Sequence, residues 1–472
     1  MYSLQLSKIV SGIVVLITVF ASLGQAQKVT VSPELLLRDD YSFALLGQVD
    51  DKILLVRNKG YTQTLSIFNS GLGFIQEIPM DFEDRKVNII GFVTSEHDFN
   101  CYYSFRDDTK EYIKSVKLSS SGEQYFQDTV FVRENVFLSE YYQFSGSDND
   151  RYIAIHNIID ESTLQLILYD NQEMEQLYET KLIVQDVSMR RDLRGIEVTN
   201  SGKLAVLFEK NNNSYRKERH HYRMVTLDKS GEVVDIRINL PEKLTVSAAL
   251  ISNNKSNDFN LVGLYGEKFD NMSVGYFVYE GDSIHTIPFP NEMLDAISIG
   301  SKKKLEGIED YGLHEVVLRN DGGYIFVMES NKEFYRSTSG PRGMRGGYRG
   351  GITDYYNEDI LVMSINSSGK FNWNTILPKK QFSQDDEGIY SSFFVFQTPS
   401  VLRLVYNDEI KNNNTVSEYI INPAGVYERN SVLSTAYQKL KLRIRSSIQV
   451  SPTSYLLTSE RNNRLNIVKI EY

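Results

Sequence analysis

The stretch that decides the fold is Lys117-Leu118-Ser119-Ser120-Ser121-Gly122, because its pattern recurs along the chain. An apolar strand residue is followed by a polar residue, two small or polar residues and a glycine, and then by another strand. Asp, Asn and Ser open such turns by bonding to their own backbone, and glycine supplies the positive φ that closes them. Each copy therefore predicts a hairpin. The other copies are 226–231, 364–369, 420–425 and, in a shorter form, 68–71.

Around these hairpins the chain divides into units of four strands. In the unit from about 194 to 238 we expect strands at 195–198, 203–209, 222–227 and 232–238. Second strands begin near residues 52, 102, 152, 203, 259, 324, 401 and 455. Such a count of similar units predicts an all-β protein, a β-propeller of eight four-stranded blades, with seven blades as the alternative count.

The two ends of the chain predict how the ring closes. The last unit holds strands at 455–459 and 465–470, and its fourth strand is missing. Residues 28–32 precede the first complete unit and have no place in it. We expect this N-terminal strand to complete the last blade, which removes the exposed sheet edge of an open ring.

The first 26 residues have the features of a secretory signal peptide. Lys8 precedes an apolar run from 9 to 23, and Gly24 and Ala26 fit the small-residue positions of a cleavage site. A retained membrane anchor is the alternative, but the run is shorter than the roughly 20 residues of a comfortable span. We therefore expect export to the periplasm, the cell surface or the medium, with no transmembrane span in the mature chain. Residues 27–472 form a single propeller domain in this prediction, since no Pro/Ser/Gly-rich linker divides them.

The net charge and the cysteine, histidine and acidic residues argue against nucleic-acid binding, an internal disulfide and a metal site. The net charge is −10, which makes nucleic acid a poor partner. Cys101 is the only cysteine, so no internal disulfide can form, and it lies in a strand-like run that predicts a buried, inert thiol. The six histidines are scattered except for His220 and His221, and we expect surface imidazoles rather than metal ligands. The acidic loops 148–150 and 385–388 lack calcium-loop spacing, and no metal or other cofactor is predicted.

Two long basic loops mark one face as the candidate binding face. Strands alternate in direction, so loops between second and third strands share a face opposite the short glycine turns. The first loop covers 210–221 and the second about 330–358, in units four and six. Long loops on a rigid scaffold commonly carry binding, and basic, Tyr-rich loops suit an anionic glycan, a phosphate or an acidic envelope protein. The alternative is that the Gly-rich stretch 340–351 is an insertion without a ligand. The candidate ligand-binding residues are Arg216, Lys217, Arg219, Tyr335, Arg336, Arg342, Arg345, Tyr348 and Arg349.

Marks of catalysis are absent from the sequence. Trp373 follows Gly369 at the Gly-x-x-x-Trp spacing of eight-bladed quinoproteins, but the spacing does not recur, so we expect local packing of Trp373 on an outer strand. There is no Gly-x-Ser-x-Gly elbow and no phosphate loop. Arg-Gly-Gly-Tyr-Arg-Gly-Gly at 345–351 has the composition of RNA-binding segments, but an exported acidic chain argues against that role.

The stretch from Gly322 to Gln381 carries a family resemblance. It runs from Asp321-Gly322-Gly323-Tyr324 through the Tyr-rich insertion to Asn366-Ser367-Ser368-Gly369, Trp373 and Leu377-Pro378-Lys379. It resembles exported, uncharacterised repeat-propeller proteins of Bacteroidota-type bacteria. The resemblance implies a propeller in the periplasm or at the cell surface, and it implies no activity. Two hypotheses follow: a binding or scaffold module of the cell envelope, or a propeller enzyme acting on extracellular carbohydrate or peptide.

Overall fold

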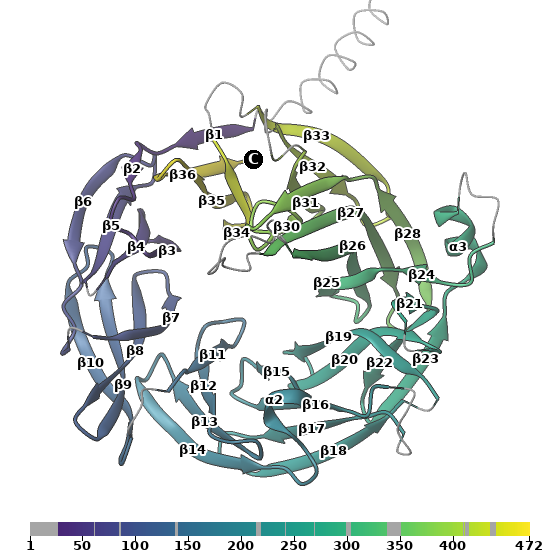
Figure 1. Ribbon diagram of the computed structural model, residues 1–472, viewed down its shortest axis with the longest axis horizontal. Helices are drawn as coiled ribbons and strands as arrows, with labels where there is room; N and C mark the ends of the chain where they lie inside the picture. The colour runs from purple at the N-terminus through teal and green to yellow at the C-terminus, as the bar shows by residue number, and fades with distance from the viewer. Residues whose placement is uncertain are drawn as a thin grey trace, which may run out of the picture.

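The computed structural model is a ring of eight four-stranded antiparallel sheets, an eight-bladed β-propeller (Figure 1). The structure describes residues 27–472 except 61, 85, 137–139, 214–218, 241, 269, 299–303, 338–350, 409, 411–414 and 435–439. The signal-peptide prediction for residues 1–26 therefore lies outside the described residues. Eight blades, rather than seven, confirm the predicted count.

Each of the first four blades is formed by consecutive strands, numbered outward from the central channel. Blade 1 contains β3 (Ser42–Val49), β4 (Lys52–Lys59), β5 (Thr62–Asn69) and β6 (Phe74–Pro79), and blade 2 contains β7 (Asn88–Thr94), β8 (Asp98–Asp107), β9 (Lys110–Ser119) and β10 (Gln124–Arg133). Blade 3 contains β11 (Gln143–Gly146), β12 (Tyr152–Ile158), β13 (Thr163–Asp170) and β14 (Glu175–Ile183). Blade 4 contains β15 (Leu193–Val198), β16 (Leu204–Lys210), β17 (His221–Leu227) and β18 (Val233–Asn239), with the short helix α2 (Met189–Asp192) before it.

The later blades carry small additions. Blade 5 contains β19 (Leu244–Asn253), β20 (Asp258–Gly266), β22 (Gly275–Glu280) and β23 (Ser283–Pro288). Beside it, β21 (Met272–Ser273) pairs with β24 (Ile308–Glu309), and helix α3 spans Asn291–Ile297. Blade 6 contains β25 (Tyr311–Leu318), β26 (Tyr324–Ser337), β27 (Gly351–Ile365) and β28 (Phe371–Leu377), with β29 (Gln381–Gln384) paired to β27. Blade 7 contains β30 (Phe393–Gln397), β31 (Leu402–Asn407), β32 (Thr415–Ile421) and β33 (Tyr427–Ser434).

The last blade joins the two ends of the chain, as predicted. It contains β34 (Leu442–Ser451), β35 (Ser454–Arg461), β36 (Arg464–Glu471) and, as its outermost strand, β1 (Lys28–Val31). Strand β1 runs antiparallel to β36 from the pair Lys28 and Glu471 to the pair Val31 and Val468. The short strand β2 (Leu35–Leu36) then pairs with the other end of β36. The first and last strands of the described chain therefore meet in one sheet (Figure 1).

The glycine turns between third and fourth strands take the conformation that the repeat requires. Gly122, Gly231, Gly369 and Gly425 have φ values between +75° and +81°. In the turn at 366–370, the side-chain oxygen of Asn366 accepts hydrogen bonds from the backbone N–H groups of Ser368 and Lys370, both at 3.0 Å. In the shorter copy at 68–71, Leu72 has the positive φ, 62°, instead of a glycine.

The alternation of strand direction divides the ring into two faces. The short-turn face carries the first-to-second and third-to-fourth connections, and the long-loop face carries the second-to-third connections and the links between blades. The core lies between neighbouring blades, where apolar side chains from the facing sheets interdigitate, as between Leu166 and Leu168 of blade 3 and Val206 and Val225 of blade 4. Cys101 is fully buried in such a cluster, and burial raises its thiol pKa far above the usual range, which agrees with an inert thiol.

Candidate functional site

The structure describes three of the nine predicted ligand-binding residues. Arg219 lies in blade 4, whereas Tyr335 and Arg336 lie in blade 6, and blade 5 separates the two blades. The others lie outside the described residues, namely Arg216, Lys217, Arg342, Arg345, Tyr348 and Arg349. Both predicted loops do connect second to third strands, so they belong to the long-loop face as expected.

The connection in blade 6 is more regular than the sequence suggested. We expected an irregular loop over about 330–358, but β26 and β27 continue as a hairpin that remains paired from Asn331 and Asn357 out to Ser337 and Gly351. Aromatic residues favour strands, and this segment contains several. Tyr335 is 70% exposed on the hairpin, whereas the Arg336 guanidinium binds both carboxylate oxygens of Asp354. The positive charge of Arg336 is therefore neutralised within the hairpin.

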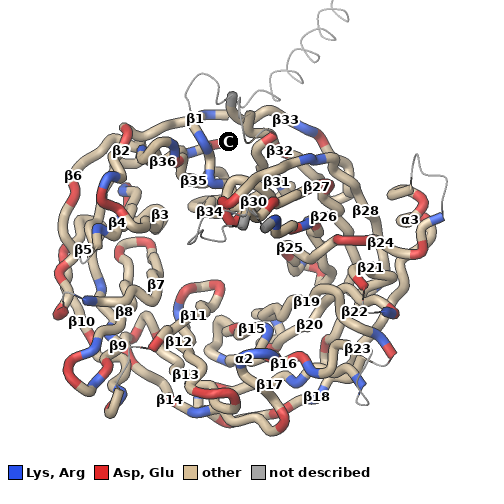
Figure 2. Tube along the Cα trace, viewed as in Figure 1, with Lys and Arg blue, Asp and Glu red and all other residues tan. Residues whose placement is uncertain are grey.

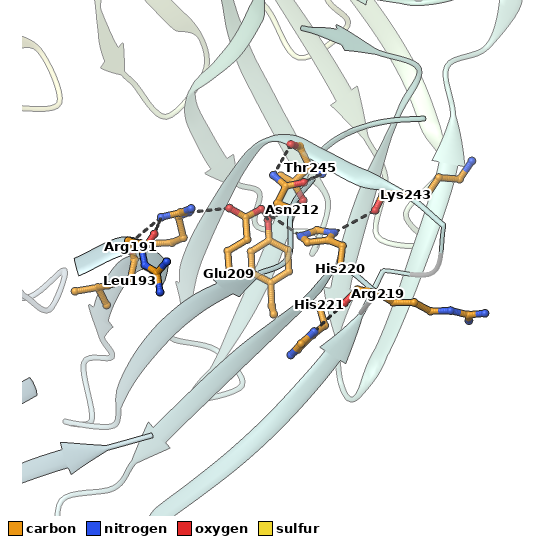
Figure 3. A network of polar contacts seen from close by, with 11 residues as sticks. Arg191, Leu193, Glu209, Asn212, Arg219, His220, His221, Lys243 and Thr245 are labelled. Carbon is orange, nitrogen blue, oxygen red and sulfur yellow. Dashed lines mark hydrogen bonds and ion pairs between the residues drawn. The ribbon is translucent and has the colours of Figure 1, made fainter. Parts of the chain in front are cut away.

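A buried polar network holds both ends of the blade 4 connection (Figure 3). The Glu209 carboxylate accepts hydrogen bonds from Arg194 Nε at 2.7 Å, His220 Nε2 at 3.2 Å and the Tyr222 hydroxyl at 3.0 Å. The other nitrogen of His220 lies 3.1 Å from the Lys243 carbonyl oxygen at the start of blade 5. Burial alone would raise the pKa of Glu209, but the hydrogen bonds from His220 and Arg194 outweigh burial and lower it. Glu209 is therefore a structural anion.

The surface-imidazole prediction was wrong for three of the six histidines. His156, His220 and His221 are between 5% and 7% exposed. His156 is buried in a second strand, β12, His220 immediately precedes the third strand β17, and His221 is the first residue of β17. The two adjacent histidines have different partners. His220 contacts Glu209 and the Lys243 carbonyl oxygen, whereas the His221 Nδ1 lies 3.1 Å from the Arg219 carbonyl oxygen.

Beyond this network, a basic cleft of about 880 Å³ opens on the long-loop face between blades 3 and 4. We call it the blade 4 cleft. Its lining combines four cationic side chains with two carboxylates, two histidines and two amides. The lining residues are Lys210, Arg219, Arg223, Arg237, Asp186, Asp235, His220, His221, Gln185 and Asn239. The lining of this cleft is therefore positively charged, although the whole chain has a net charge of −10.

Strand periodicity explains how these residues come together. Alternate residues of a strand share a face, so His221 and Arg223 project from one face of β17, and Arg219 lies in the loop before this strand. Arg237 lies directly opposite Arg223 on β18, and Asn239 lies opposite His221. Toward the short-turn face the same row continues as Val225 and Leu227, which pack in the core against blade 3. The row therefore changes from apolar to cationic as it reaches the long-loop face.

Ion pairing inside the cleft leaves two of its cations uncompensated. Lys210 pairs with Asp192 at 2.9 Å, and Arg223 pairs with Asp235 and donates to the Gln185 carbonyl oxygen at 2.6 Å. Within the described part of the chain, Arg219 and Arg237 have no carboxylate partner. Arg237 donates to the Asn239 side-chain oxygen at 3.1 Å and lies 3.3 Å from the His221 Nδ1. Burial lowers the pKa of His221, and the charges of Arg237 and Lys210 lower it further.

Sequence reasoning found Arg219 but missed the strand residues of the cleft. The signal was present in His221-Tyr222-Arg223 and in Asp235-Ile236-Arg237-Ile238-Asn239, where polar residues occupy every second position. Such alternation on a predicted outer strand indicates a polar face. It does not say that the two strands place Arg223 and Arg237 opposite each other, because that depends on the register.

A second cleft, of about 700 Å³, lies at the channel mouth on the short-turn face. We call it the channel-mouth cleft. It is lined by the inner strands β15, β19 and β25 and holds Glu197, His314 and Glu315. Burial, assisted by the charge of Asp148, raises the pKa of Glu197 to about 7. Burial also raises the pKa of Glu315, whose Oε1 accepts a hydrogen bond from Gln397 at 2.9 Å, and lowers the pKa of His314.

Charge is otherwise dispersed over the molecule. Figure 2 shows acidic and basic residues alternating around the ring instead of gathering in one sector. Among the described residues, no three His, Cys, Asp or Glu side chains are grouped so that they could hold a metal ion. In the same part of the chain, no helix has the length and apolar character needed to cross a membrane.

The sequence matches no protein-family model and no curated protein. Solved structures of low identity match the chain with TM-scores below 0.5. The WD40 domain of SCAP from fission yeast is 7% identical, with a TM-score of 0.41 and 94% of each chain covered. A europium-containing methanol dehydrogenase is 7% identical, with a TM-score of 0.42 and 95% of each chain covered. The propeller domain of the Trilobed protease from Pyrococcus furiosus is 10% identical, with a TM-score of 0.39, and covers 83% of this chain and 98% of its own. At this level of similarity the neighbours carry no argument about function, and the fold rests on the strand pairing described above.

Proposed function

We propose that this chain is an exported binding module of the cell envelope that holds a negatively charged ligand in the blade 4 cleft. One observation carries the proposal: Arg219 and Arg237 face one cleft of an acidic protein without a carboxylate partner among the described residues. An arginine fork recognises carboxylate, sulfate and phosphate groups through paired hydrogen bonds. The cleft also has the size of small-molecule sites, which occupy roughly 300–1,000 Å³.

The rest of the ring supports a binding role. Eight closed blades form a rigid frame, and the Glu209 network fixes both ends of the loop that carries Arg219. Preorganised side chains bind more tightly because less conformational freedom is lost on association. Export is supported by the signal-peptide features of the first 26 residues, and an envelope location would expose the cleft to acidic glycans and envelope proteins.

The first test is binding of the purified protein to uronate-containing, sulfated and neutral glycans at low and high salt. We expect binding to the anionic glycans only, weakening with salt because exposed charge pairs are screened. Arg237→Gln should weaken binding at least tenfold. Arg429→Gln is the matched control, because Arg429 is also an exposed arginine of an outermost strand, β33, but pairs with Asp408 at 2.6 Å. Equal binding by wild type and Arg237→Gln would exclude the blade 4 cleft as the site.

The role of the blade 6 loop can be tested in the same assay. A deletion should remove only residues 338–350, because residues 331–337 are paired in the β26–β27 hairpin. Unchanged binding would assign the ligand to blade 4 alone. Weaker binding with an unchanged melting temperature would show that the second basic loop also contributes.

A second candidate function, hydrolysis of an extracellular carbohydrate or peptide, is favoured by the channel-mouth cleft. A carboxyl group with a pKa of about 7 can serve as a general acid at neutral pH, and Glu197 has this property. If the cleft is catalytic, activity on a panel of oligosaccharides and peptides should fall as the pH rises through about 7, and Glu197→Gln should abolish it. Absence of turnover from pH 5 to pH 9 in a folded sample would leave binding as the function.

A further inference from the structure

The blade 4 cleft has an unusual mixture of charges for an anion site. Arg223 and Arg237 lie directly opposite each other across the β17–β18 pair, and like charges in this position repel. Asp235 compensates Arg223 but is already bound to it. Arg237 has no carboxylate partner among the described residues, so one negatively charged group of a ligand could bind beside it.

The remaining lining consists of hydrogen-bond acceptors and donors rather than further cations. Asp186 is exposed in the cleft and has no ion-pair partner among the described residues, and the exposed amides of Gln185 and Asn239 lie on the same lining. A carboxylate such as Asp186 accepts hydrogen bonds from hydroxyl groups and repels a second negative charge. This part of the cleft suits a neutral, hydroxyl-rich part of a ligand.

We infer that the ligand of the blade 4 cleft is a uronate-bearing oligosaccharide, with one sugar carboxylate on Arg237 and neighbouring sugar hydroxyls on Asp186 and the two amides. This inference rests on the proposed binding function and specifies its ligand. Densely charged polymers such as polyphosphate or heavily sulfated glycans fit less well, because Asp186 and Asp235 would face additional anionic groups. The volume of about 880 Å³ accommodates more than one sugar ring.

The test compares a uronate tetrasaccharide with the same tetrasaccharide after reduction of its carboxylates to alcohols. Calorimetric titration should show binding of the uronate and at least tenfold weaker binding of the reduced form, since only the anionic group differs. Arg237→Gln should lower affinity for the uronate at least tenfold and leave affinity for the reduced form unchanged. Equal affinity for both oligosaccharides would overturn the inference.

Asp186→Asn should change the affinity for a uronate and the affinity for a heavily sulfated glycan in opposite directions. The residue has a φ of 59°, a conformation that Asn tolerates, so the variant should fold normally. It should weaken uronate binding several-fold by removing a strong acceptor, and strengthen binding of a heavily sulfated glycan by removing a repulsive charge. An increase in affinity for the uronate as well would contradict the assigned role of Asp186.

These experiments separate the two levels of the hypothesis. If a sulfated glycan or inorganic phosphate binds in an Arg237-dependent manner and the uronate does not, the blade 4 cleft is an anion site but the inferred ligand class is wrong. If no anion binds to a protein with an intact melting transition, the proposed binding function fails with it.

Discussion

Burial sets the charge state of His156 in the second strand of blade 3. Its side chain is 7% exposed, and burial lowers its pKa to about 4. In the unfolded chain a histidine has a pKa of about 6.5, so below that pH the unfolded state binds a proton that the folded state does not. Stability is therefore complete above pH 6.5 and declines as the pH falls toward 4. A pKa shift of this size corresponds to a change of about 3 kcal/mol in the free energy of unfolding.

His156→Gln should remove this part of the pH dependence. Urea unfolding at pH 7 and pH 4.5 should show a smaller loss of free energy of unfolding for the variant than for the wild type, because glutamine does not titrate. His285→Gln is the control, since His285 is exposed on β23. Parallel pH profiles for wild type and His156→Gln would show that burial does not hold this imidazole neutral.

His221 should make ligand binding depend on pH. Its ring faces Arg237 and the Arg219 carbonyl, with Lys210 opposite on β16 and His220 adjacent, and its pKa in the free protein is lowered by burial. A bound carboxylate beside Arg237 would favour the imidazolium and raise that pKa. Affinity for a uronate should therefore increase as the pH falls through the pKa of His221 in the complex, and it should level off below the lowered pKa of the free protein; a half to one pKa unit of coupling gives about threefold to tenfold in total. The dependence should disappear in His221→Gln.

The burial and the partners of single side chains were harder to predict from the sequence than the strands or the ring. The burial of Cys101 followed from its strand-like surroundings, but the same reasoning did not extend to His220 and His221, which the sequence places beside a long polar loop. The His220 ring contacts Glu209 and the Lys243 carbonyl oxygen at the start of the next blade, and neither contact is local in sequence. Similarly, the neighbours of Arg237, which include no carboxylate in the described part of the chain, depend on cross-strand register.

At the scale of elements, each glycine turn is also a contact between blades. A Cβ added at Gly122 would lie 2.1 Å from the Ile78 side chain, and one at Gly425 would lie 2.6 Å from the Trp373 ring. In both cases the turn packs against the outermost strand of the preceding blade. Trp373 also donates from its Nε1 to the Pro423 carbonyl oxygen at 3.0 Å. Trp373 lies on an outer strand, β28, as predicted, but its packing is not local, because its partner is the turn of blade 7.

Gly425→Ala should destabilise the propeller by about 2–4 kcal/mol. Its φ of +81° costs an L-residue roughly 1–3 kcal/mol, and overlap with the Trp373 ring adds to that cost. Trp373→Leu in the same chain should relieve the overlap but not the backbone strain, so a double-mutant cycle should give a coupling of at least about 0.5 kcal/mol. Gly71→Ala is the control, because a Cβ there would lie 3.5 Å from its only close neighbour. Additive effects would show that the turn and the ring do not interact.

The repeat made the elements predictable, because turn chemistry and strand alternation are local properties. All eight second strands begin within four residues of their expected positions; the one near 102 begins at Asp98. The hairpin of blade 6 was underestimated, since the glycine-rich composition of its tip obscured the strand residues beside it. Loop length in the sequence therefore overstated how much of this connection is irregular.

For the molecule as a whole, closure of the ring depends on one short segment. Strand β1 pairs with β36, and Lys28 forms an ion pair with Glu471 at 3.1 Å. Val29 and Val31 pack on the apolar cluster between blades 7 and 8. Beyond the strand, the Ser32 N–H donates to the Ile467 carbonyl oxygen and the Ser32 Oγ accepts from the Ile467 N–H, both at 2.9 Å. Removing this segment would leave the outer edge of β36 unpaired.

A variant that begins at residue 40 should therefore melt at a lower temperature and self-associate, because an unpaired strand edge is a template for another chain. The matched control begins at residue 27 and keeps β1 and β2. A synthetic peptide of residues 27–38, added in excess, should restore the melting temperature in proportion to the logarithm of its concentration, since it binds only the folded ring by strand addition. The same peptide with Val29 and Val31 replaced by Asp should not, because its apolar face would be lost. If the truncated chain were as stable and monomeric as the control, the ring would be held by packing between blades 1 and 8 rather than by the N-terminal strand.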